Sequence, residues 1–492
     1  MTLPFVELTG DIRVPTVAAE TNLTSGVSSL PQLRKKLLLV GYSLAAKSAN
    51  DEKIFPITSG AFADETWGAG SMLALMARAA LAVQPTLEMW GVSAPEGSTA
   101  MTGTVTVAGG DTSKAVASGT LIVTIAGRRF KVGITVGDSL TEIAAAMVVE
   151  INNETSLPCT ADNAAGVITL TANNEGPEQT IRYRAEIVGT GTEDPITVAT
   201  AADLFSGSAT EGDIEDALVV AEGDRYHIIV SGCNDADNIA LLCDGSTGHV
   251  DRMSTGLEQK WCYGIVGVDS DVSAATSQAT TTDAYRLQIA CQVAAERPSY
   301  EIAAIFGALR ARYVDPAESL DWVEMTGLQA TYDASQWINR ADEELALSGG
   351  VTILRSLRTG KVEIVRSVNT KVTSVASGYY DHNPIEISDY MDESLVAAFR
   401  RKAAGKKLKS LSVAGTPNTI TTTKAKQILH EVMRTLDRLD YIEGVESDIA
   451  AGLTAAEINA TDRNRLDIGC PFRPIGRAHV IAILKTLTVN AL

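Results

Sequence analysis

One serine of the chain stands in a pattern that hydrolytic enzymes use. Ser139 lies in the run GDSLT (137–141), and much later in the chain Asp224 and His227 are separated by two residues. A serine attacks an ester when a histidine takes its proton and hydrogen-bond donors stabilise the oxyanion that forms. The residue types for ester hydrolysis are therefore present, and the question is whether their order and their surroundings fit it.

The order of these residues does not fit this chemistry. GDSLT resembles the nucleophile motif of the GDSL hydrolases, and Gly232 with Asn234 resembles their Gly-x-Asn-Asp block, but Asp-x-x-His should follow that block and here precedes it. Ser139 and Glu142 have instead the spacing of a capping box, in which each side chain satisfies a free amide at the start of a helix. We therefore predict that Ser139 caps a helix over residues 139–152.

A metal site can be drawn from four residues of suitable type. His227, Cys233, Cys243 and His249 follow the spacing His-x5-Cys-x9-Cys-x5-His, without the short clips of two to four residues that zinc modules contain. Lone cysteines in apolar segments usually act as small hydrophobic residues. The sequence thus predicts neither a metal site nor a cofactor.

Phosphate-binding loops are also missing from the pattern. Gly360 and Lys361 lack the glycine five residues earlier that a phosphate loop requires, and the run GAGSM (68–72) lacks the third glycine of a dinucleotide fingerprint. We expect no catalytic residues.

The composition of the chain disfavours some classes of binding partner. The 492 residues contain 41 Lys and Arg against 60 Asp and Glu, so the net charge is −19. An acidic surface repels phosphate backbones and anionic lipid, which disfavours direct nucleic-acid and membrane binding. The most apolar early stretch, Leu37–Ala46, is about half the length of a membrane-spanning helix. The N-terminus lacks a signal-peptide pattern, and the scattered cysteines indicate reduced thiols in a cytosol.

One basic run contrasts with this acidic background. It lies near the end of a predicted helix over residues 392–410, where the helix dipole favours cations, so a solvated helix end explains it. The alternative is a contact with an acidic partner. The run consists of Arg400, Arg401, Lys402, Lys406, Lys407 and Lys409.

Changes in composition and in the hydrophobic pattern divide the sequence into five parts. Residues 1–25 form an extended arm, and residues 26–100 together with 211–378 form a discontinuous α/β domain with parallel strands. Between its two pieces, residues 101–210 form an inserted β-rich domain of short alternating strands. Residues 379–474 form an α+β domain, and residues 475–492 a C-terminal strand. The fold class is thus α/β and multidomain.

Three local features refine this division. A helix is expected from about Asp235 to Gly256, and residues 351–372 are expected to form a hairpin that turns at Thr359-Gly360. The unbroken apolar run Val480–Leu484 is typical of a strand buried on both faces. At the other end, Ile12 and Val14 alternate with Arg13 between two prolines, as in an extended segment that lies along another surface.

The order of these parts resembles the contractile tail sheath proteins of bacteriophages, specifically the Mu-like group. Four stretches support the resemblance, and together they span nearly the whole chain. They are DIRVPTVAAE (11–20), WGAGSMLALMARAALAVQP with LEMWGVSA (67–94), IAGRRFKVGITVGDSLTEIAAAMVVEIN (125–152) and FRPIGRAHVIAILKTL (472–487).

The resemblance implies a structural protein without cofactor or enzymatic activity. Subunits would polymerise helically around an inner tail tube and contract to drive the tube through the host cell envelope. Both terminal arms would add strands to neighbouring subunits, the inserted domain would protrude outward, and residues 379–474 would face the tube. The residues that would make the arm contacts are Ile12, Arg13, Val14, Val480, Ile481, Ile483 and Leu484.

The same resemblance implies the partners and the location. The partners would be other copies of the chain, the tube protein, and the baseplate and tail terminator proteins. The location would be the virion, after assembly in the host cytoplasm, and the basic run would face the tube. Three alternatives remain: a sheath of a phage-derived injection machine, a hydrolase built on Ser139, and a soluble α/β binding protein.

Overall fold

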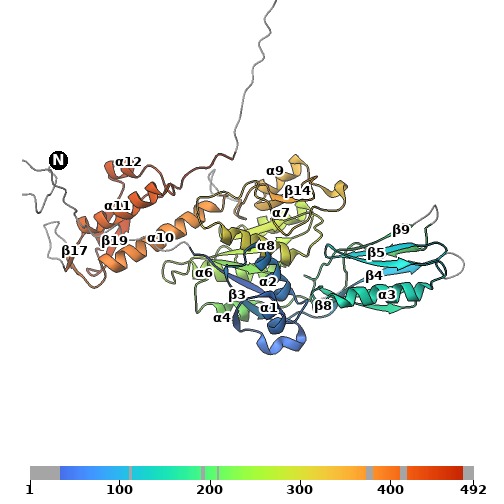
Figure 1. Ribbon diagram of the computed structural model, residues 1–492. Helices are drawn as coiled ribbons and strands as arrows, with labels where there is room; N and C mark the ends of the chain where they lie inside the picture. The colour runs from blue at the N-terminus through green and yellow to red at the C-terminus, as the bar shows by residue number, and fades with distance from the viewer. Residues whose placement is uncertain are drawn as a thin grey trace, which may run out of the picture. The chain divides into compact units, whose positions relative to one another are not determined.

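The computed structural model describes residues 34–109, 114–189, 194–207, 210–372, 380–409 and 418–479 (Figure 1). These residues form two compact units. The main unit contains the described residues up to Asp389 and those from Pro474 onward, and the C-terminal unit is Tyr390–Arg473. The chain passes from one unit to the other within helix α10 (Asn383–Lys402). No helix among the described residues has both the length and the apolar character needed to cross a membrane.

An eight-stranded sheet forms the centre of the main unit. Its order is β15-β14-β13-β12-β11-β1-β3-β2. The six inner strands run parallel, whereas β2 and β15 pair antiparallel at the two edges. The strands are β1 (Lys36–Tyr42), β2 (Ile54–Pro56), β3 (Glu88–Ala94), β11 (Ile228–Ser231), β12 (Tyr263–Val268), β13 (Leu287–Cys291), β14 (Val351–Ser356) and β15 (Val362–Ile364).

Helices cover both faces of this sheet. A Cβ atom added at Gly264 would meet Leu242 of helix α5 (Ala236–Leu242), and one added at Gly267 would meet backbone atoms of helix α8 (Ser299–Arg312). Positions 264 and 267 of one strand point to opposite faces, so α5 and α8 lie on opposite sides. This three-layer arrangement explains why the parallel strands are largely apolar on both faces.

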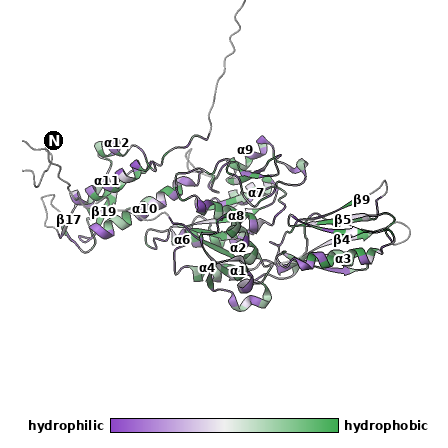
Figure 2. Ribbon diagram, viewed as in Figure 1, coloured by the Kyte–Doolittle hydropathy of each residue, from purple (hydrophilic) through white to green (hydrophobic). Residues whose placement is uncertain are grey.

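Helix α8 packs against helix α2 (Met72–Val83), and nearly all residues of both helices are buried. Figure 2 shows both of them largely in the colour of hydrophobic residues. The remaining helical segments of the layers are η1 (Ala45–Asn50), α1 (Gly60–Trp67), α4 (Glu215–Ala221), α6 (His249–Met253), α7 (Val272–Thr282), η2 (Ala334–Gln336) and α9 (Arg340–Ser348).

The helix expected from Asp235 to Gly256 is wrong in its extent, because two short helices, α5 and α6, replace it. The Asp244 side chain accepts hydrogen bonds from the amides of Ser246, Thr247 and Gly248, and Gly245 adopts φ +78°. An aspartate that binds the backbone amides after it favours a turn over a helix. The hairpin expected over residues 351–372 is confirmed in its turn and its antiparallel pairing, with Gly360 at φ +82°, but it is shorter than expected because β15 ends at Ile364.

Two smaller antiparallel sheets lie between β3 and β11 in the chain. Their orders are β10-β4-β8-β7 and β6-β5-β9, and they enclose a hydrophobic cluster separate from that of the large sheet. Helix α3 (Leu140–Asn153) packs against them. The strands are β4 (Ala100–Ala108), β5 (Gly119–Ile125), β6 (Arg128–Ile134), β7 (Cys159–Ala164), β8 (Val167–Glu175), β9 (Tyr183–Gly189) and β10 (Thr197–Thr200).

The C-terminal unit is built on the amphipathic helix α11 (Thr422–Arg438), whose apolar face packs on small sheets. It also contains β16 (Lys407–Lys409), β17 (Thr419–Thr421), α12 (Val445–Ala450), β18 (Ala455–Ile458) and β19 (Leu466–Gly469). The prediction of a helix over residues 392–410 is therefore wrong at its C-terminal end. Helix α10 stops at Lys402, Gly405 adopts φ +72°, and β16 then pairs in parallel with β17.

Candidate functional site: a filled crevice and a buried ion cluster

Parallel α/β sheets bind ligands at the carboxyl ends of the strands, where the strand order reverses. In this sheet the reversal lies between β1 and β11, because the chain goes from β1 to β3 on one side and later to β11 on the other. Helix α2 begins beside this point, since a Cβ atom on Gly41 or Gly232 would meet Met72 at its start. A nucleotide-binding protein would place its ligand here.

The protein's own side chains occupy this crevice. Asn174, at the end of β8, accepts a hydrogen bond from the amide of Met72 at 2.7 Å and donates to the carbonyl of Ser43 at 2.6 Å. Tyr42 donates to the carboxyl group of Glu178 at 2.7 Å and accepts from the amide of Gly212 at 3.0 Å. Side chains that follow β8 thus bind the start of α2 and the end of β1 in place of a ligand.

Glu178 is a buried acidic residue of this crevice. Its residue is 4% exposed, and its second carboxyl oxygen has no hydrogen-bond partner among the described residues. Burial raises the pKa of Glu178 to about 7, although the hydrogen bond from Tyr42 opposes the shift. The carboxyl group therefore changes charge near neutral pH inside the contact that joins the insertion to the large sheet.

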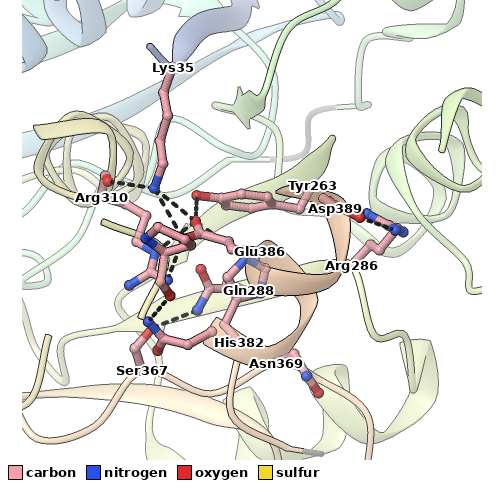
Figure 3. Close-up of polar contacts among 12 residues, drawn as sticks. Lys35, Tyr263, Arg286, Gln288, Arg310, Ser367, Asn369, His382, Glu386 and Asp389 are labelled. Carbon is pink, nitrogen blue, oxygen red and sulfur yellow. Dashed lines mark hydrogen bonds and ion pairs between the residues drawn. The ribbon is translucent and has the colours of Figure 1, made fainter. Parts of the chain in front are cut away.

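A second group of buried polar residues lies at the amino ends of the strands (Figure 3). Glu386, on the first half of α10, forms ion pairs with Lys35 at 3.0 Å and with Arg310 at 2.8 Å. The hydroxyl group of Tyr263 donates to the same carboxylate. Lys35 precedes β1, Tyr263 begins β12 and Arg310 belongs to α8, so one carboxylate connects three elements to α10.

The pKa of the buried carboxyl group in this cluster is shifted in the opposite direction from that of Glu178 in the crevice. Burial alone would raise the pKa of Glu386, but the charges of Arg310 and Lys35 outweigh burial and hold it far below its ordinary value. His382 is fully buried with its ring 4.1 Å from that of Tyr263, and burial keeps its pKa well below the ordinary value. Glu386 is therefore ionised and His382 neutral at pH 7.

One turn further along α10, a second ion pair joins it to the sheet. Arg286, which precedes β13, donates two hydrogen bonds to Asp389, at 2.8 and 2.7 Å. Such paired geometry is the strongest form of an arginine–carboxylate contact. Gln288 of β13 donates to the hydroxyl group of Ser367 at 2.8 Å. The carboxylates of Glu386 and Asp389 are each paired with arginine, which suits a structural joint, whereas neither ring nitrogen of His382 has a hydrogen-bond partner among the described residues.

The structure separates the residues that the sequence suggested for hydrolysis. Ser139 caps α3, and the reciprocal bonds with Glu142 confirm the predicted capping box. His227 accepts a hydrogen bond from the amide of Lys36 at 3.1 Å, and burial lowers its pKa to about 3. Asp224 pairs with the side chain of Lys36 at 3.0 Å. Ser139 and His227 are thus each committed to a different element.

Of the four residues considered for zinc, Cys233, Cys243 and His249 are buried in the main unit and His227 is partly buried. Burial raises the pKa of the Cys233 and Cys243 thiols well above the ordinary value and lowers the pKa of His249 to about 4. A thiol that resists ionisation is a poor metal ligand. Among the described residues, no three His, Cys, Asp or Glu side chains form a group that could hold a metal ion.

The basic run is divided between two elements of the C-terminal unit. Arg400, Arg401 and Lys402 are in the last turn of α10, where Lys402 forms an ion pair with Glu431 of α11. Lys406, Lys407 and Lys409 are exposed on the loop and on β16. The predicted arm residues lie outside the described part of the chain; they are Ile12, Arg13, Val14, Val480, Ile481, Ile483 and Leu484.

Neither of the two buried polar clusters was predicted from the sequence. Lys35 and Glu386 are 351 residues apart, and Tyr42 and Glu178 are 136 residues apart. No local spacing in the sequence predicts contacts between residues so far apart in the chain. The one available signal was the presence of polar residues next to apolar strand or helix segments, as in Lys35 before the run that begins at Leu37.

Comparison with known proteins gives one relative by sequence. The chain is 29% identical over 251 residues to the Mu-like prophage FluMu tail sheath protein of Haemophilus influenzae, and this covers 49% of each chain. The chain thus spans about half the length of the curated relative it matches. The resemblance to Mu-like tail sheath proteins is confirmed by this relative. No family model matches the chain.

Three solved structures align with most of the chain. A sheath tail protein from Desulfitobacterium hafniense is 14% identical with a TM-score of 0.47, over 90% of this chain and 93% of that one. A sheath tail protein from Listeria innocua is 13% identical, also with a TM-score of 0.47, over 92% of this chain and 94% of that one. The helical sheath of the anti-feeding prophage in its contracted state is 9% identical with a TM-score of 0.47, over 96% and 99%. All three TM-scores lie below 0.5.

Proposed function

We propose that this protein is a subunit of a contractile tail sheath. It polymerises helically around an inner tail tube, and contraction of the polymer drives the tube through the host cell envelope. The observation that carries the proposal is the 29% identity over 251 residues to a tail sheath protein of a Mu-like prophage. The filled crevice supports a structural role, because the place where an α/β enzyme binds its ligand contains the protein's own side chains.

In this proposal, residues 26–100 and 211–378 form the middle domain of the subunit and residues 101–210 protrude outward from it. The separate sheets and hydrophobic cluster of the insertion support such a division. Residues 379–474 form the domain that faces the tube. Residues 1–25 and 475–492 are arms that add strands to neighbouring subunits through Ile12, Arg13, Val14, Val480, Ile481, Ile483 and Leu484.

Strand addition gives a physical basis for the movement. Backbone hydrogen bonds between an arm and a neighbour's sheet join the subunits, while the linkers allow the rigid bodies to shift without losing the connection. The work of contraction then comes from the difference in free energy between two packings, so that no cofactor is required. The paired charges of the ion cluster keep the large sheet and the start of α10 rigid during this shift.

The proposed partners are other copies of the chain, the tube protein, and the baseplate and tail terminator proteins. The protein is part of the virion and assembles in the host cytoplasm. A sheath of a phage-derived injection machine is built from the same kind of subunit and remains the alternative. The genes next to this one distinguish the two, since capsid and packaging genes accompany a virion.

Electron microscopy of the purified full chain tests self-assembly. We expect tubes or polysheath without any other component, and loss of these assemblies when residues 480–492 are deleted. The matched control is the full-length Ser139→Ala variant, which should form tubes because Ser139 only caps α3. A monodisperse monomer at high concentration, or normal tubes from the deletion variant, would contradict the proposal.

Charge reversal tests the surface that meets the tube. Replacing Lys406, Lys407 and Lys409 by glutamate should leave tubes of the sheath protein intact but abolish co-assembly with the tube protein, since like charges repel across an interface. The control reverses three other exposed lysines of the main unit, Lys53, Lys114 and Lys131. Co-sedimentation with the tube measures the difference, and unimpaired binding by the first variant would refute the tube-facing assignment.

A further inference from the structure

The groove between helices α4 and α5 is lined mainly by acidic side chains. Both helices belong to the main unit, and α5 also packs against α6 (α4 and α6 are labelled in Figure 1). The groove has a volume of about 750 Å³. A single guanidinium group, that of Arg252 on α6, lines it together with five carboxyl groups. These belong to Asp213, Glu215, Glu222, Asp237 and Asp244.

Helix α4 presents two of these carboxylates with an apolar surface between them. Glu215 and Glu222 are seven residues apart, which corresponds to about 10 Å along a helix. Leu218 and Val219 lie between them on the same face, because residues three and four apart in a helix are neighbours. All four side chains line the groove. The groove thus has acidic ends and an apolar middle along this wall.

The starts of the two helices are bound to each other. Asn238 of α5 is 2% exposed; it accepts a hydrogen bond from the amide of Ile214 at 3.1 Å and donates to the carbonyl of Gly212 at 2.8 Å. The acidic residues next to these positions in the chain therefore meet at one end of the groove. None of them forms an ion pair with a described residue; they are Asp213, Glu215 and Asp237.

The other end of the groove contains charges of both signs. Arg252 pairs with Glu222 at 2.7 Å. The ammonium group of Lys260, itself 4.0 Å from Glu258, donates to the carbonyl of Glu222. Asp244 also lines this part of the groove and accepts hydrogen bonds from the amides that follow it. The groove therefore keeps a net negative charge, most of it at the start of the two helices.

A buried histidine at the start of α6 also lines the groove. His249 is 2% exposed, and its Nδ1 atom has no hydrogen-bond partner among the described residues. Burial lowers the pKa of His249 to about 4, although Glu222 opposes the shift, so the ring is neutral at pH 7. A neutral ring has one lone pair that can accept a hydrogen bond. A buried polar atom without a partner is costly, so a ligand that donates an N–H group would be stabilised here.

The helix dipole accounts for Glu215 and Asp237 one at a time, because acidic residues are favoured in the first turn of a helix. It does not account for the unpartnered ring of His249 in the same groove. A ligand that satisfies both features must carry positive charge at its ends, N–H groups to donate, and an apolar body.

We propose that the groove between α4 and α5 binds a linear aliphatic polyamine. Its end ammonium groups contact the carboxylates at the two ends of the groove, its methylene groups lie on Leu218 and Val219, and an inner N–H group donates to His249. An extended chain advances about 1.2 Å per bond, so spermidine, with nine bonds between its end nitrogens, spans about 11 Å and matches the spacing of the carboxylates on α4. The site lies within the main unit and does not depend on the proposed sheath function.

Isothermal titration calorimetry of the purified full-length protein with spermidine tests the proposal. We expect one saturable site per chain at pH 7 in a buffer of low ionic strength, because salt screens exposed charges. A diamine with four carbons, 1,4-diaminobutane, spans only about 6 Å and should bind at least tenfold more weakly. A diamine with eight carbons, 1,8-diaminooctane, has the length of spermidine without its inner nitrogen and should bind with intermediate affinity.

Variants of the acidic end test the charges. Glu215→Gln combined with Asp237→Asn removes two exposed carboxylates, and spermidine should bind about tenfold more weakly. The matched control combines Glu65→Gln with Asp216→Asn, which removes the same charge from exposed positions that do not line the groove. We expect the control to change the affinity less than about twofold.

His249→Phe tests the inner contact, because phenylalanine keeps a ring without a polar atom. Spermidine should bind about fivefold more weakly to this variant, as the loss of one hydrogen bond implies, whereas 1,8-diaminooctane should bind as before. The acidic variant changes only exposed residues, so it still decides the question if His249→Phe does not fold.

Four results would overturn the proposal. They are the absence of saturable binding at millimolar spermidine, equally tight binding of Mg²⁺ from magnesium chloride, equal weakening by the acidic variant and its control, and an unchanged preference for spermidine over 1,8-diaminooctane in folded His249→Phe. Sedimentation of the same samples identifies heat that comes from dissociation of assembled chains. Such heat would mean that another copy of the chain occupies the groove, which also contradicts the proposal.

Discussion

The two ends of the large parallel sheet hold buried carboxyl groups in opposite ways. At the amino ends of the strands, Glu386 is 6% exposed and is paired with Lys35 and Arg310. At the carboxyl ends, Glu178 is 4% exposed and receives the hydroxyl group of Tyr42. The pKa of Glu386 is therefore held far below its ordinary value, whereas that of Glu178 rises to about 7.

The difference shows that burial alone does not decide the charge of a carboxyl group. Near-equal burial gives an ionised group where two cations are near and a half-protonated group at neutral pH where none is. Glu386, in the joint with α10, consequently keeps its charge in the neutral range. The joint with the insertion changes its charge there, so the two ends of one sheet respond differently to the same conditions.

Removal of the charge of Glu386 should have the largest effect. Glu386→Gln leaves Lys35 and Arg310 buried without a counter-charge, which costs about 3–5 kcal/mol of the unfolding free energy. Urea denaturation at pH 7 measures this loss. Because the pKa of Glu386 is lowered in the folded state, its stabilisation is present above the ordinary carboxyl pKa and disappears as the pH falls, so the difference from the wild type should shrink in acid.

The control for this variant is Glu344→Gln. Glu344 forms an ion pair with Arg340 four residues earlier on α9, but both side chains are largely exposed, at 69% and 88%. We expect a change within about 0.5 kcal/mol. Equal effects of the two substitutions would show that the buried cluster stabilises no more than a surface ion pair.

The contribution of Glu178 to the unfolding free energy should be smaller than that of Glu386. Its pH dependence should also be opposite, because it is lost as the pH rises. Its folded-state pKa of about 7 lies above the ordinary value of 4.5, so the native state binds more protons than the unfolded state between these values. The contribution of this group is fully present below pH 4.5 and is lost as the pH rises to 7, by roughly 3 kcal/mol.

Glu178→Gln tests this assignment because glutamine resembles the protonated acid at every pH. Urea denaturation between pH 5 and pH 8 should show a flatter pH profile for the variant than for the wild type. Parallel profiles would mean that Glu178 does not titrate in this range and that the contrast with Glu386 is absent.

The smallest effect is expected from Asn174, the neutral member of the crevice. Asn174→Ala removes its bonds to the amide of Met72 and the carbonyl of Ser43, and also its bond to the carboxylate of Glu96 at 2.9 Å. The cost at pH 7 should be about 1–3 kcal/mol of the unfolding free energy, because buried groups lose their partner. Urea denaturation measures it, and an unchanged unfolding free energy would show that these bonds do not stabilise the crevice.

The sequence predicted those parts of the fold that local patterns specify. The three-residue spacing of Ser139 and Glu142 forms the capping box of α3. The turn at Gly360 forms the β14–β15 hairpin. In each case the interacting groups are close in the chain, so their types and spacing carry the information.

Local patterns failed where a competing local bond or a distant strand decided the structure. The helix expected to continue to Gly256 is interrupted at Asp244, whose side chain binds the following amides. The helix expected to reach residue 410 ends at Lys402, because β16 pairs with β17 ten or more residues further on. The helical periodicity of the sequence predicts neither the turn at Asp244 nor the pairing of β16 with β17.

The sequence by itself determined the α/β class, the acidic surface, the helix caps and the similarity to tail sheath proteins, because these depend on composition and on neighbours in the chain. Only the tertiary structure decided that Asn174 and Glu178 fill the crevice, that Glu386 meets Lys35, and that His249 lines the groove between α4 and α5. Hydrogen bonds and ion pairs act over a few ångströms in space. Residues separated by 351 positions come within that distance only after the sheet and its helices have formed.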